Sequence, residues 1–170
     1  ATPRQPGLVP AAFAQVQLYP PYNQADAVAG LEEFSHIWLT FVFHQTAQQG
    51  WKPKVRPPRL GGNKKLGVFA TRSTFRPNPL GLSLVKLESI DTSNGVILHV
   101  SGADLIDQTP ILDIKPYLPW VEAIADAKSG FASSDQVLQL PIQYSEQAQQ
   151  FLATRPELFE LIEQVLLHDP

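Results

Sequence analysis

The chain alternates short apolar runs with connections rich in Pro, Gly and Asn, a pattern that predicts many short strands. The clearest run is 36–43, where Ile37, Leu39, Phe41 and Phe43 share one face at a period of two residues. We therefore expect a central strand with this face in the core. The other predicted strands are 15–19, 67–71, 80–87, 96–101, 111–114 and 137–142. A short helix is predicted at 24–30.

After Tyr144 the pattern changes to helical spacing, which predicts helices at 145–153 and 156–167. Pro156 stands at a first-turn position that favours a helix start. Residues 1–144 are thus expected to form a β core, either a barrel or a sandwich, followed by a helical segment at 145–170. The stretch 51–65 (WKPKVRPPRLGGNKK) is predicted to be a long irregular loop because its prolines remove backbone donors.

Charge is distributed very unevenly along the chain. The net charge is -3, yet residues 34–87 contain no Asp or Glu and nine Lys or Arg. Such segregation favours a positive face for a polyanion such as nucleic acid. The sequence has no Cys, which excludes a disulfide framework and a thiolate metal site and is consistent with a reducing cytoplasm. No run of about 18 apolar residues occurs, so we expect no membrane partner.

Common catalytic motifs are missing: we find no GxGxxG turn, no phosphate-binding GxxxxGK[ST] loop and no HExxH pair. His36 and His44 would share one strand face, but about 3.3 Å per residue separates them by roughly 26 Å, too far to bind one metal ion. We therefore expect no metal site. Four polar clusters remain as candidates for chemistry, at residues 3–7, 44–46, 71–79 and 107–117.

Long blocks of the sequence resemble the TsaA-like (YaeB or TrmO) family. They are PRQPGL at 3–8, FVFHQT at 41–46, WKPKVRPPRLGGNKKLGVFATRSTFRPNPLGLSLV at 51–85 and DLIDQTPILDIKPYLP at 104–119. The resemblance implies a small β-barrel that is a homodimeric, S-adenosylmethionine-dependent tRNA methyltransferase of the cytoplasm. Its substrate would be the exocyclic nitrogen of threonylcarbamoyl-adenosine, next to the anticodon. Family members extend beyond both ends of this chain, with a further barrel strand before residue 1 and a small domain after residue 170.

The resemblance also implies site residues. Cofactor contacts are expected at Pro3, Arg4, Gln5, His44, Gln45, Arg72, Leu82, Asp107, Gln108, Thr109 and Pro110. RNA contacts are expected from basic residues of the 51–65 loop and its neighbourhood, namely Lys52, Lys54, Arg56, Arg59, Lys64, Lys65 and Arg76. The family usually has Gly at position 108, which predicts either an altered turn or a Gln108 side chain that closes over the ligand.

The general base is left open between Asp107 and His44. Two other functions also stay open: an RNA-binding barrel without a cofactor, and a barrel that senses the cofactor without transferring a methyl group.

Overall fold

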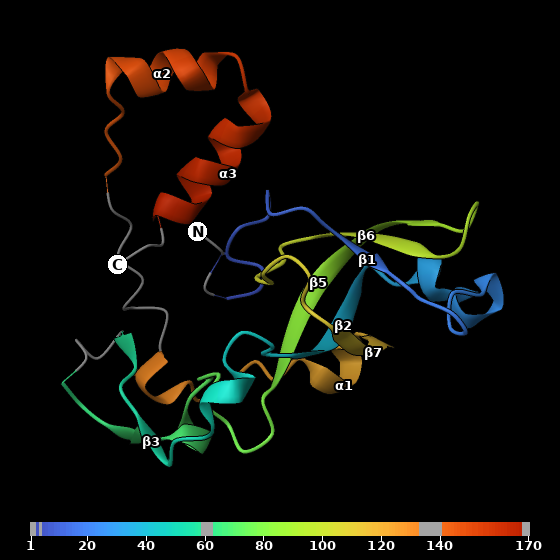
Figure 1. The fold of residues 1–170 in the computed structure, drawn as a ribbon, viewed down its shortest axis with the longest axis horizontal. Helices are drawn as coiled ribbons and strands as arrows, with labels where there is room; N and C mark the ends of the chain where they lie inside the picture. The colour runs from blue at the N-terminus through green and yellow to red at the C-terminus, as the bar shows by residue number, and fades with distance from the viewer. Residues whose placement is uncertain (1–2, 4, 59–62, 133–140, 168–170) are drawn as a thin grey trace.

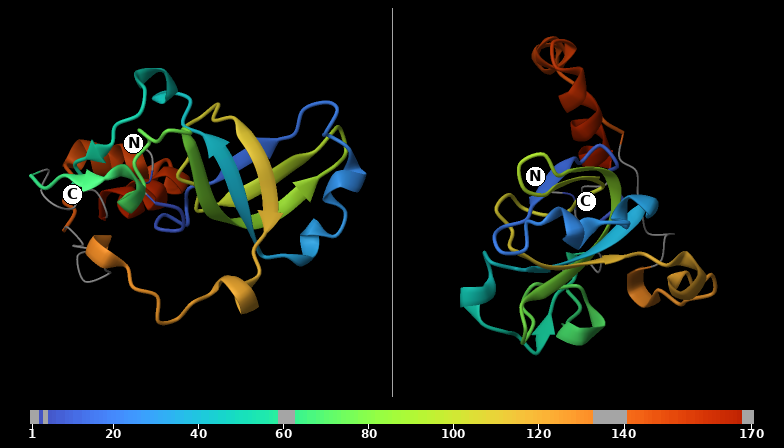
Figure 2. Two further views of the ribbon diagram at one scale, coloured as in Figure 1. Left: turned by 90° about the horizontal axis from the view of Figure 1, so that it is seen from below. Right: turned by 90° about the vertical axis from the view of Figure 1, so that its right-hand side faces the viewer.

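The computed structural model describes Pro3 and residues 5–58, 63–132 and 141–167, and its centre is one antiparallel β-sheet (Figure 1). Five strands form the sheet in the order β1-β6-β5-β2-β7. Their bounds are Ala14–Gln17 (β1), His36–Val42 (β2), Leu80–Asp91 (β5), Ile97–Ser101 (β6) and Ile111–Pro116 (β7). The sheet curls into a half-barrel (Figure 2), and the mainly β fold predicted from the sequence is confirmed.

Strand β5 is the longest strand and carries the sheet around its bend. Its first part, Leu80–Lys86, pairs with β2, and its last part, Lys86–Asp91, pairs with β6. The β5-β6 register shifts between Leu87 and Ser89, an irregularity of the β-bulge type. A bulge bends a strand and increases its twist, so β5 can follow the curl of the sheet while it pairs on both sides.

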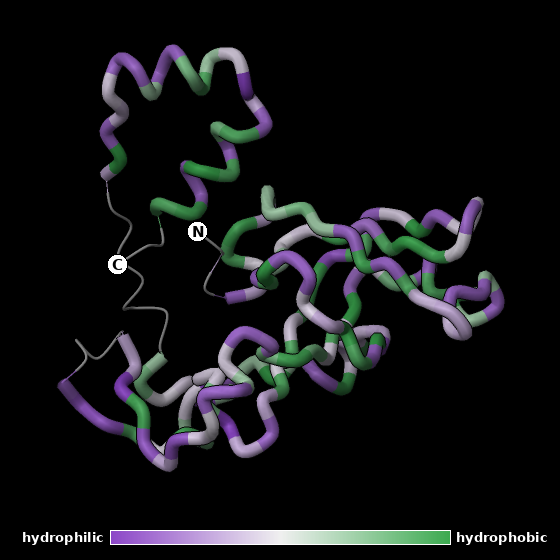
Figure 3. Tube along the Cα trace, viewed as in Figure 1, coloured by the Kyte–Doolittle hydropathy of each residue, from purple (hydrophilic) through white to green (hydrophobic). Residues whose placement is uncertain are grey.

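The predicted core face of β2 is confirmed for Ile37, Leu39 and Phe41, whereas Phe43 lies past the end of the strand at Val42 and is only partly buried. Ile37 and Leu39 are fully buried, and Phe41 is 6% exposed. The alternation along the strands is visible as alternating hydropathy in Figure 3. Phe41 lies opposite Gly81 of β5, and a Cβ atom at Gly81 would come within 2.2 Å of Phe41 Cζ. Because Gly81 has no side chain, the Phe41 ring can occupy the space beside it.

Two expectations for residues 51–71 are wrong. Lys54–Val55 (β3) pairs with Leu66–Gly67 (β4), so the segment 51–65 is not wholly irregular. The predicted strand 67–71 ends at Gly67, because Val68–Ala70 forms a 3-10 turn. Both the backbone N–H and the hydroxyl of Thr71 donate to the Val68 carbonyl, at 3.1 and 2.9 Å. These local bonds satisfy the backbone without a neighbouring strand.

The remaining segments follow the predicted pattern with small shifts. The predicted helix 24–30 is a 3-10 helix at Ala25–Val28, and a second one follows at Leu31–Glu33. The predicted strand 137–142 lies largely outside the described residues. A four-residue helix that the pattern did not predict, α1 (Pro119–Glu122), follows β7, and Glu122 accepts a 2.9 Å hydrogen bond from the Trp38 indole.

Two C-terminal helices, α2 (Glu146–Ala153) and α3 (Pro156–Leu167), confirm the helical prediction. They stand beside the sheet as a hairpin (Figure 1), and α3 alternates hydrophobic and hydrophilic turns (Figure 3). Ser145 caps α2 by accepting from Ala148 N at 3.2 Å. The side-chain carbonyl of Gln164 accepts from Ala11 N at 2.9 Å, which attaches α3 to the segment before β1. The boundary at residue 144 remains a prediction.

Candidate active site

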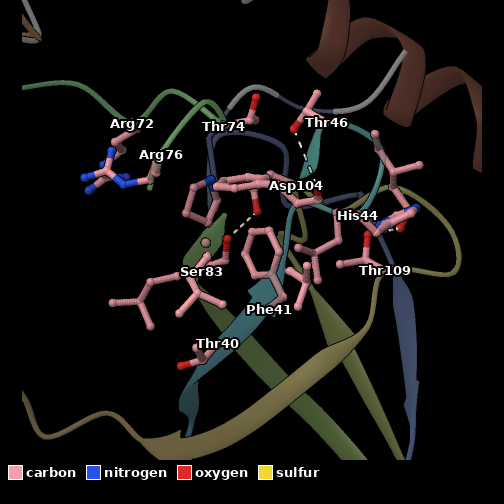
Figure 4. A pocket seen from close by; sticks show the side chains of 18 of the residues that line it. Thr40, Phe41, His44, Thr46, Arg72, Thr74, Arg76, Ser83, Asp104 and Thr109 are labelled. Atoms are coloured by element: carbon pink, nitrogen blue, oxygen red, sulfur yellow. Dashed lines mark hydrogen bonds between the residues drawn. The ribbon is translucent and has the colours of Figure 1, made fainter. Parts of the chain in front are cut away.

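A cavity of about 680 Å³ opens where strand β2 ends and strand β5 begins. Its volume lies within the range of small-molecule sites. Segments far apart in the sequence meet here, and its lining draws on Pro3, on residues 5–6 and on parts of the segments 38–46, 71–76, 80–83 and 104–109. In Figure 4, Arg72 and Arg76 lie on one side of the pocket and His44 and Thr109 on the other, with Ser83, Asp104 and Phe41 between them.

The N-terminal segment is attached to this cavity by two contacts. Arg72 Nη1 donates to Gln5 Oε1 at 2.8 Å, and Gly7 N donates to the Gly102 carbonyl at 2.9 Å. Gly102 has a φ of +73°, and a Cβ atom there would lie 3.3 Å from Gly7 Cα. A side chain at position 102 would thus be strained and crowd the N-terminal segment, which forms part of the cavity wall.

The innermost polar pair of the cavity is Ser83 and Asp104. The Ser83 hydroxyl donates to Asp104 Oδ1 at 2.6 Å, and Ser83 is 1% exposed. Burial raises the pKa of Asp104, while the Ser83 hydrogen bond and the positive charge of Arg72 partly oppose the rise. A carboxyl group with a raised pKa inside a cavity is a strong candidate for proton transfer.

Arg76 braces the loop that forms one wall. Its Nη1 atom donates to the carbonyls of Thr71 at 2.7 Å and Val68 at 3.3 Å. The guanidinium carbon also lies 5.7 Å from the centre of the Phe69 ring, which is 75% exposed. Arg76, predicted to bind RNA, therefore lies in the cavity wall and has a structural role there.

Comparison with known proteins decides the family. The profile described as the tRNA-methyltransferase O N-terminal domain matches residues 1–123. The chain belongs to this family. It is 52% identical over 175 aligned residues to the tRNA (adenine(37)-N6)-methyltransferase of Escherichia coli K12, covering 100% of this chain and 74% of that protein. It is 49% identical to a candidate S-adenosylmethionine-dependent methyltransferase, RcsF, of Pseudomonas aeruginosa, with the same coverage.

The chain also shares its fold with a solved structure of this family. The crystal structure of TrmO from P. aeruginosa superposes with a TM-score of 0.78 at 42% sequence identity. The match covers 99% of this chain and 73% of that one. This agreement shows that the chain shares the overall fold of that TrmO structure.

Most of the expected cofactor residues meet in the cavity. Those that line it are Pro3, Gln5, His44, Gln45, Arg72, Leu82 and Thr109. Arg4 lies outside the described residues. Asp107, Gln108 and Pro110 are not among the described residues that line it; they belong to the neighbouring turn. The expected residues thus fall into two groups. The lining group contacts the cavity, and the turn group (Asp107, Gln108 and Pro110) lies beside it.

In the 106–109 turn, Gln108 keeps the backbone conformation that the Gly implied by the resemblance would adopt. Gln108 has a φ of +62°, the left-handed conformation that Gly adopts most easily. Its N–H donates to Asp107 Oδ1 at 3.0 Å, and the Thr109 hydroxyl donates to the Ile106 carbonyl at 2.6 Å. The Gln108 side chain is turned towards Asp107 and does not close over the cavity. Asp107 Oδ1 therefore accepts its hydrogen bonds from Gln108 within this exposed turn.

Among the described residues expected to bind RNA, only Arg76 lines the cavity. Lys54, Arg56, Lys64 and Lys65 are exposed on and around β3 and β4. Lys52 is also exposed, but its Nζ atom lies 3.8 Å from the centre of the Phe75 ring, so its ammonium group makes a cation-π contact. Arg59 lies outside the described residues.

Sequence reasoning missed Asp104. The sequence did contain a hint of a buried polar pair. Ser83 falls on the same face of its strand as the apolar Val85 and Leu87. A hydroxyl buried on such a face needs a polar partner. The pattern could not tell which residue would supply that partner, because Asp104 lies 21 positions further along the chain.

Two features of the part of the chain that the structure describes concern metal ions and membranes: the grouping of potential metal ligands and the length of its helices. Within residues 5–58, 63–132 and 141–167, no three His, Asp or Glu side chains are grouped to hold a metal ion. In the same ranges, the longest helices are too short or too polar to cross a membrane.

Proposed function

We propose that this chain transfers a methyl group from S-adenosylmethionine to N6 of adenine 37 in tRNA, the base next to the anticodon. The adenine would carry its threonylcarbamoyl group, as the family resemblance implies. Relatives of the same family are tRNA (adenine(37)-N6)-methyltransferases. The observation that carries the proposal is the convergence on one cavity of the four blocks that define the resemblance, at 3–8, 41–46, 51–85 and 104–119.

The residues of the cavity fit the chemistry of the proposed cofactor. S-adenosylmethionine supplies a methyl group on a sulfonium cation and also carries an ammonium, a carboxylate and an adenine. Arg72, which Gln5 holds in place, provides a fork for the carboxylate of the cofactor. Apolar surface from Phe41 and Leu82 can pack against the adenine ring.

We therefore propose that the lining group binds the cofactor: Pro3, Gln5, His44, Gln45, Arg72, Leu82 and Thr109. The proposed role of Asp107, Gln108 and Pro110 is to shape the turn that places Thr109 in the wall. Arg4 remains a prediction on the strength of the resemblance alone.

The tRNA is proposed to bind across the exposed basic residues near β3 and β4. Lys54, Arg56, Lys64 and Lys65 present ammonium and guanidinium groups in a segment without acidic residues. Such groups bind phosphates and add a salt-dependent contribution to affinity. Arg59 belongs to the same stretch of sequence and is proposed with them.

A homodimer and a cytoplasmic location complete the proposal. Exposed apolar side chains on and around α1 would suit a second copy, because Trp120 is 84% exposed and Ile124 is 66% exposed. A tRNA substrate supports the proposed cytoplasmic location.

One experiment separates this function from its alternatives. Calorimetry first measures binding of S-adenosylmethionine, and methyl transfer is then assayed with tRNA that carries or lacks the threonylcarbamoyl group. We expect cofactor binding and transfer only to the carbamoylated tRNA. RNA binding without cofactor binding would instead support an RNA-binding barrel. Cofactor binding without transfer to either tRNA would support a sensor of the cofactor.

A further inference from the structure

We propose that Asp104 is the proton acceptor of the methyl transfer and that Ser83 is its positioning residue. The inference deepens the proposed function and rests on it. Asp104 lies in the wall of the cavity, between the arginines of the 71–76 loop and His44 (Figure 4). Asp107, the carboxylate that the sequence suggested for this role, lies in the exposed turn outside the cavity.

The geometry leaves Asp104 oriented and able to accept a proton. Ser83 comes from the buried face of β5, and its hydroxyl holds Asp104 Oδ1 at 2.6 Å. A carboxylate has two acceptor oxygens, so the bond to Oδ1 fixes the group while Oδ2 can meet a substrate N–H. Ser83 is itself fixed, because β5 pairs with β2 on one side through residues 80–86.

The electrostatics of the cavity make Asp104 a stronger base than an exposed aspartate. Burial raises the pKa of Asp104, and the ideal catalytic pKa lies close to the working pH. The charged or titratable groups that share the cavity among the described residues are Arg72, Arg76 and His44. Arg72 opposes the rise, so the carboxylate form remains accessible. By contrast, the exposed carboxyl groups of Asp91 and Asp113 have lowered pKa values because of local hydrogen bonds.

The proton balance of the reaction requires such a group. As the adenine N6 nitrogen bonds to the methyl carbon, the bond from that carbon to sulfur breaks and its electron pair stays on sulfur. The N6 proton passes to the Asp104 carboxylate, which later releases it to water. The carbamoyl group withdraws electrons from N6 and makes its N–H more acidic, so one carboxylate is a sufficient base.

A different role for Asp104 would be to bind the ammonium group of the cofactor, and a third would be purely structural. The three roles differ in what Asp104→Asn changes. Loss of a base lowers kcat and leaves cofactor affinity intact. Loss of an ammonium contact weakens cofactor binding, and loss of a structural contact lowers the melting temperature without a specific kinetic effect.

The test compares the full chain with Asp104→Asn and with Asp91→Asn, a matched control that removes an exposed carboxylate from the end of β5. With threonylcarbamoylated tRNA, we expect Asp104→Asn to lower kcat at least about 100-fold. The dissociation constant of S-adenosylmethionine should stay within about twofold by calorimetry, and the control should match the wild type. An unchanged kcat, or a loss of cofactor affinity as large as the loss of kcat, would overturn the proposal.

Ser83→Ala gives an independent test through pH. The Ser83 hydrogen bond lowers the pKa of Asp104, so its removal should raise that pKa further. The acid limb of the kcat profile should then move to higher pH, and an NMR titration of the Asp104 carboxyl carbon, without cofactor or tRNA, should move the same way. If the NMR titration moves and the kcat profile does not, Asp104 is not the base. A wild-type chain that transfers no methyl group would refute the proposed function itself. An Asp104→Asn variant with full activity would refute only the role of Asp104.

Discussion

The hydrogen bond from Arg72 to Gln5, at 2.8 Å, joins residues that are 67 positions apart and places a guanidinium at the cavity. Because a guanidinium has five N–H donors, one bond to Gln5 leaves others for a carboxylate. We expect Arg72→Ala to weaken binding of S-adenosylmethionine by about 1.5–3 kcal/mol, as measured by calorimetry. Thermal unfolding without ligand is the control. Wild-type affinity combined with a lower melting temperature would mean that Arg72 only fastens the N-terminal segment.

The ionisation of Asp104 should also change how the free energy of unfolding depends on pH. Its pKa is raised by burial above the value of about 3.9 expected in the unfolded chain. Between these two values the folded protein binds more protons than the unfolded chain, so the contribution of Asp104 to stability falls as pH rises. The free energy of unfolding of Asp104→Asn, relative to wild type, should therefore increase as pH rises through this window.

Denaturant unfolding at a series of pH values measures this difference, and Asp91→Asn supplies a control of opposite sign. Hydrogen bonds from Ser93 lower the pKa of Asp91, so its contribution is present above about 3.9 and is lost as pH falls through the lowered value. The relative stability of Asp91→Asn should therefore decrease as pH rises from the lowered pKa towards about 3.9. A pH-independent difference for Asp104→Asn would contradict the raised pKa.

At the scale of elements, the pairing of β2 with β5 shapes the cavity through one contact. Phe41 lies opposite Gly81, and a Cβ atom at Gly81 would lie 2.2 Å from Phe41 Cζ. Gly81→Ala must displace the Phe41 ring or the strand, and overpacking of this kind costs about 1–3 kcal/mol. Because Phe41 lines the cavity, cofactor affinity should fall as well.

Denaturant unfolding and calorimetry test this expectation, and Gly67→Ala in β4 is a matched control. Gly67 has a φ of -58°, and a Cβ atom there would meet nothing within 4 Å. The control should keep the stability and cofactor affinity of the wild type. Equal stability of the two variants would mean that the Phe41 ring moves without cost.

At the scale of the whole molecule, the net charge of -3 hides a basic region that is proposed to bind tRNA. Each phosphate contact contributes about 0.7–0.9 to the slope of log affinity against log salt concentration. Replacing Lys64 and Lys65 with Ala should flatten that slope by roughly 1 to 2 units, because both side chains are exposed near β4. Filter binding at several salt concentrations measures the slope.

The control for this prediction replaces Lys115 and Lys128, two exposed lysines outside the 34–87 stretch. It removes the same charge and should leave the slope unchanged. Cofactor affinity should be unaffected in both double variants, because none of the four lysines is among the described residues that line the cavity. An equal change of slope in both would mean that only net charge matters.

Much of the fold could be predicted from local pattern. The buried face of β2 and the bounds of α2 and α3 follow from hydrophobic spacing, which is a property of neighbouring residues. Prediction failed where a local bond competes with a strand, as at Val68, whose carbonyl accepts from Thr71. It also failed at β3, where two residues form a ladder only because β4 returns beside them.

The candidate site, like the fold, could be predicted from the sequence only in part. The blocks at its walls could be found in the sequence by resemblance, and the sequence by itself determined a mainly β chain with a basic stretch and a helical end. Only the tertiary structure decided that Asp104 faces the cavity and that Asp107 does not. The reason is physical: the Ser83–Asp104 bond depends on how β5 bends at its bulge and on where the chain after β6 returns. Such contacts depend on the register of distant strands, which no local pattern specifies.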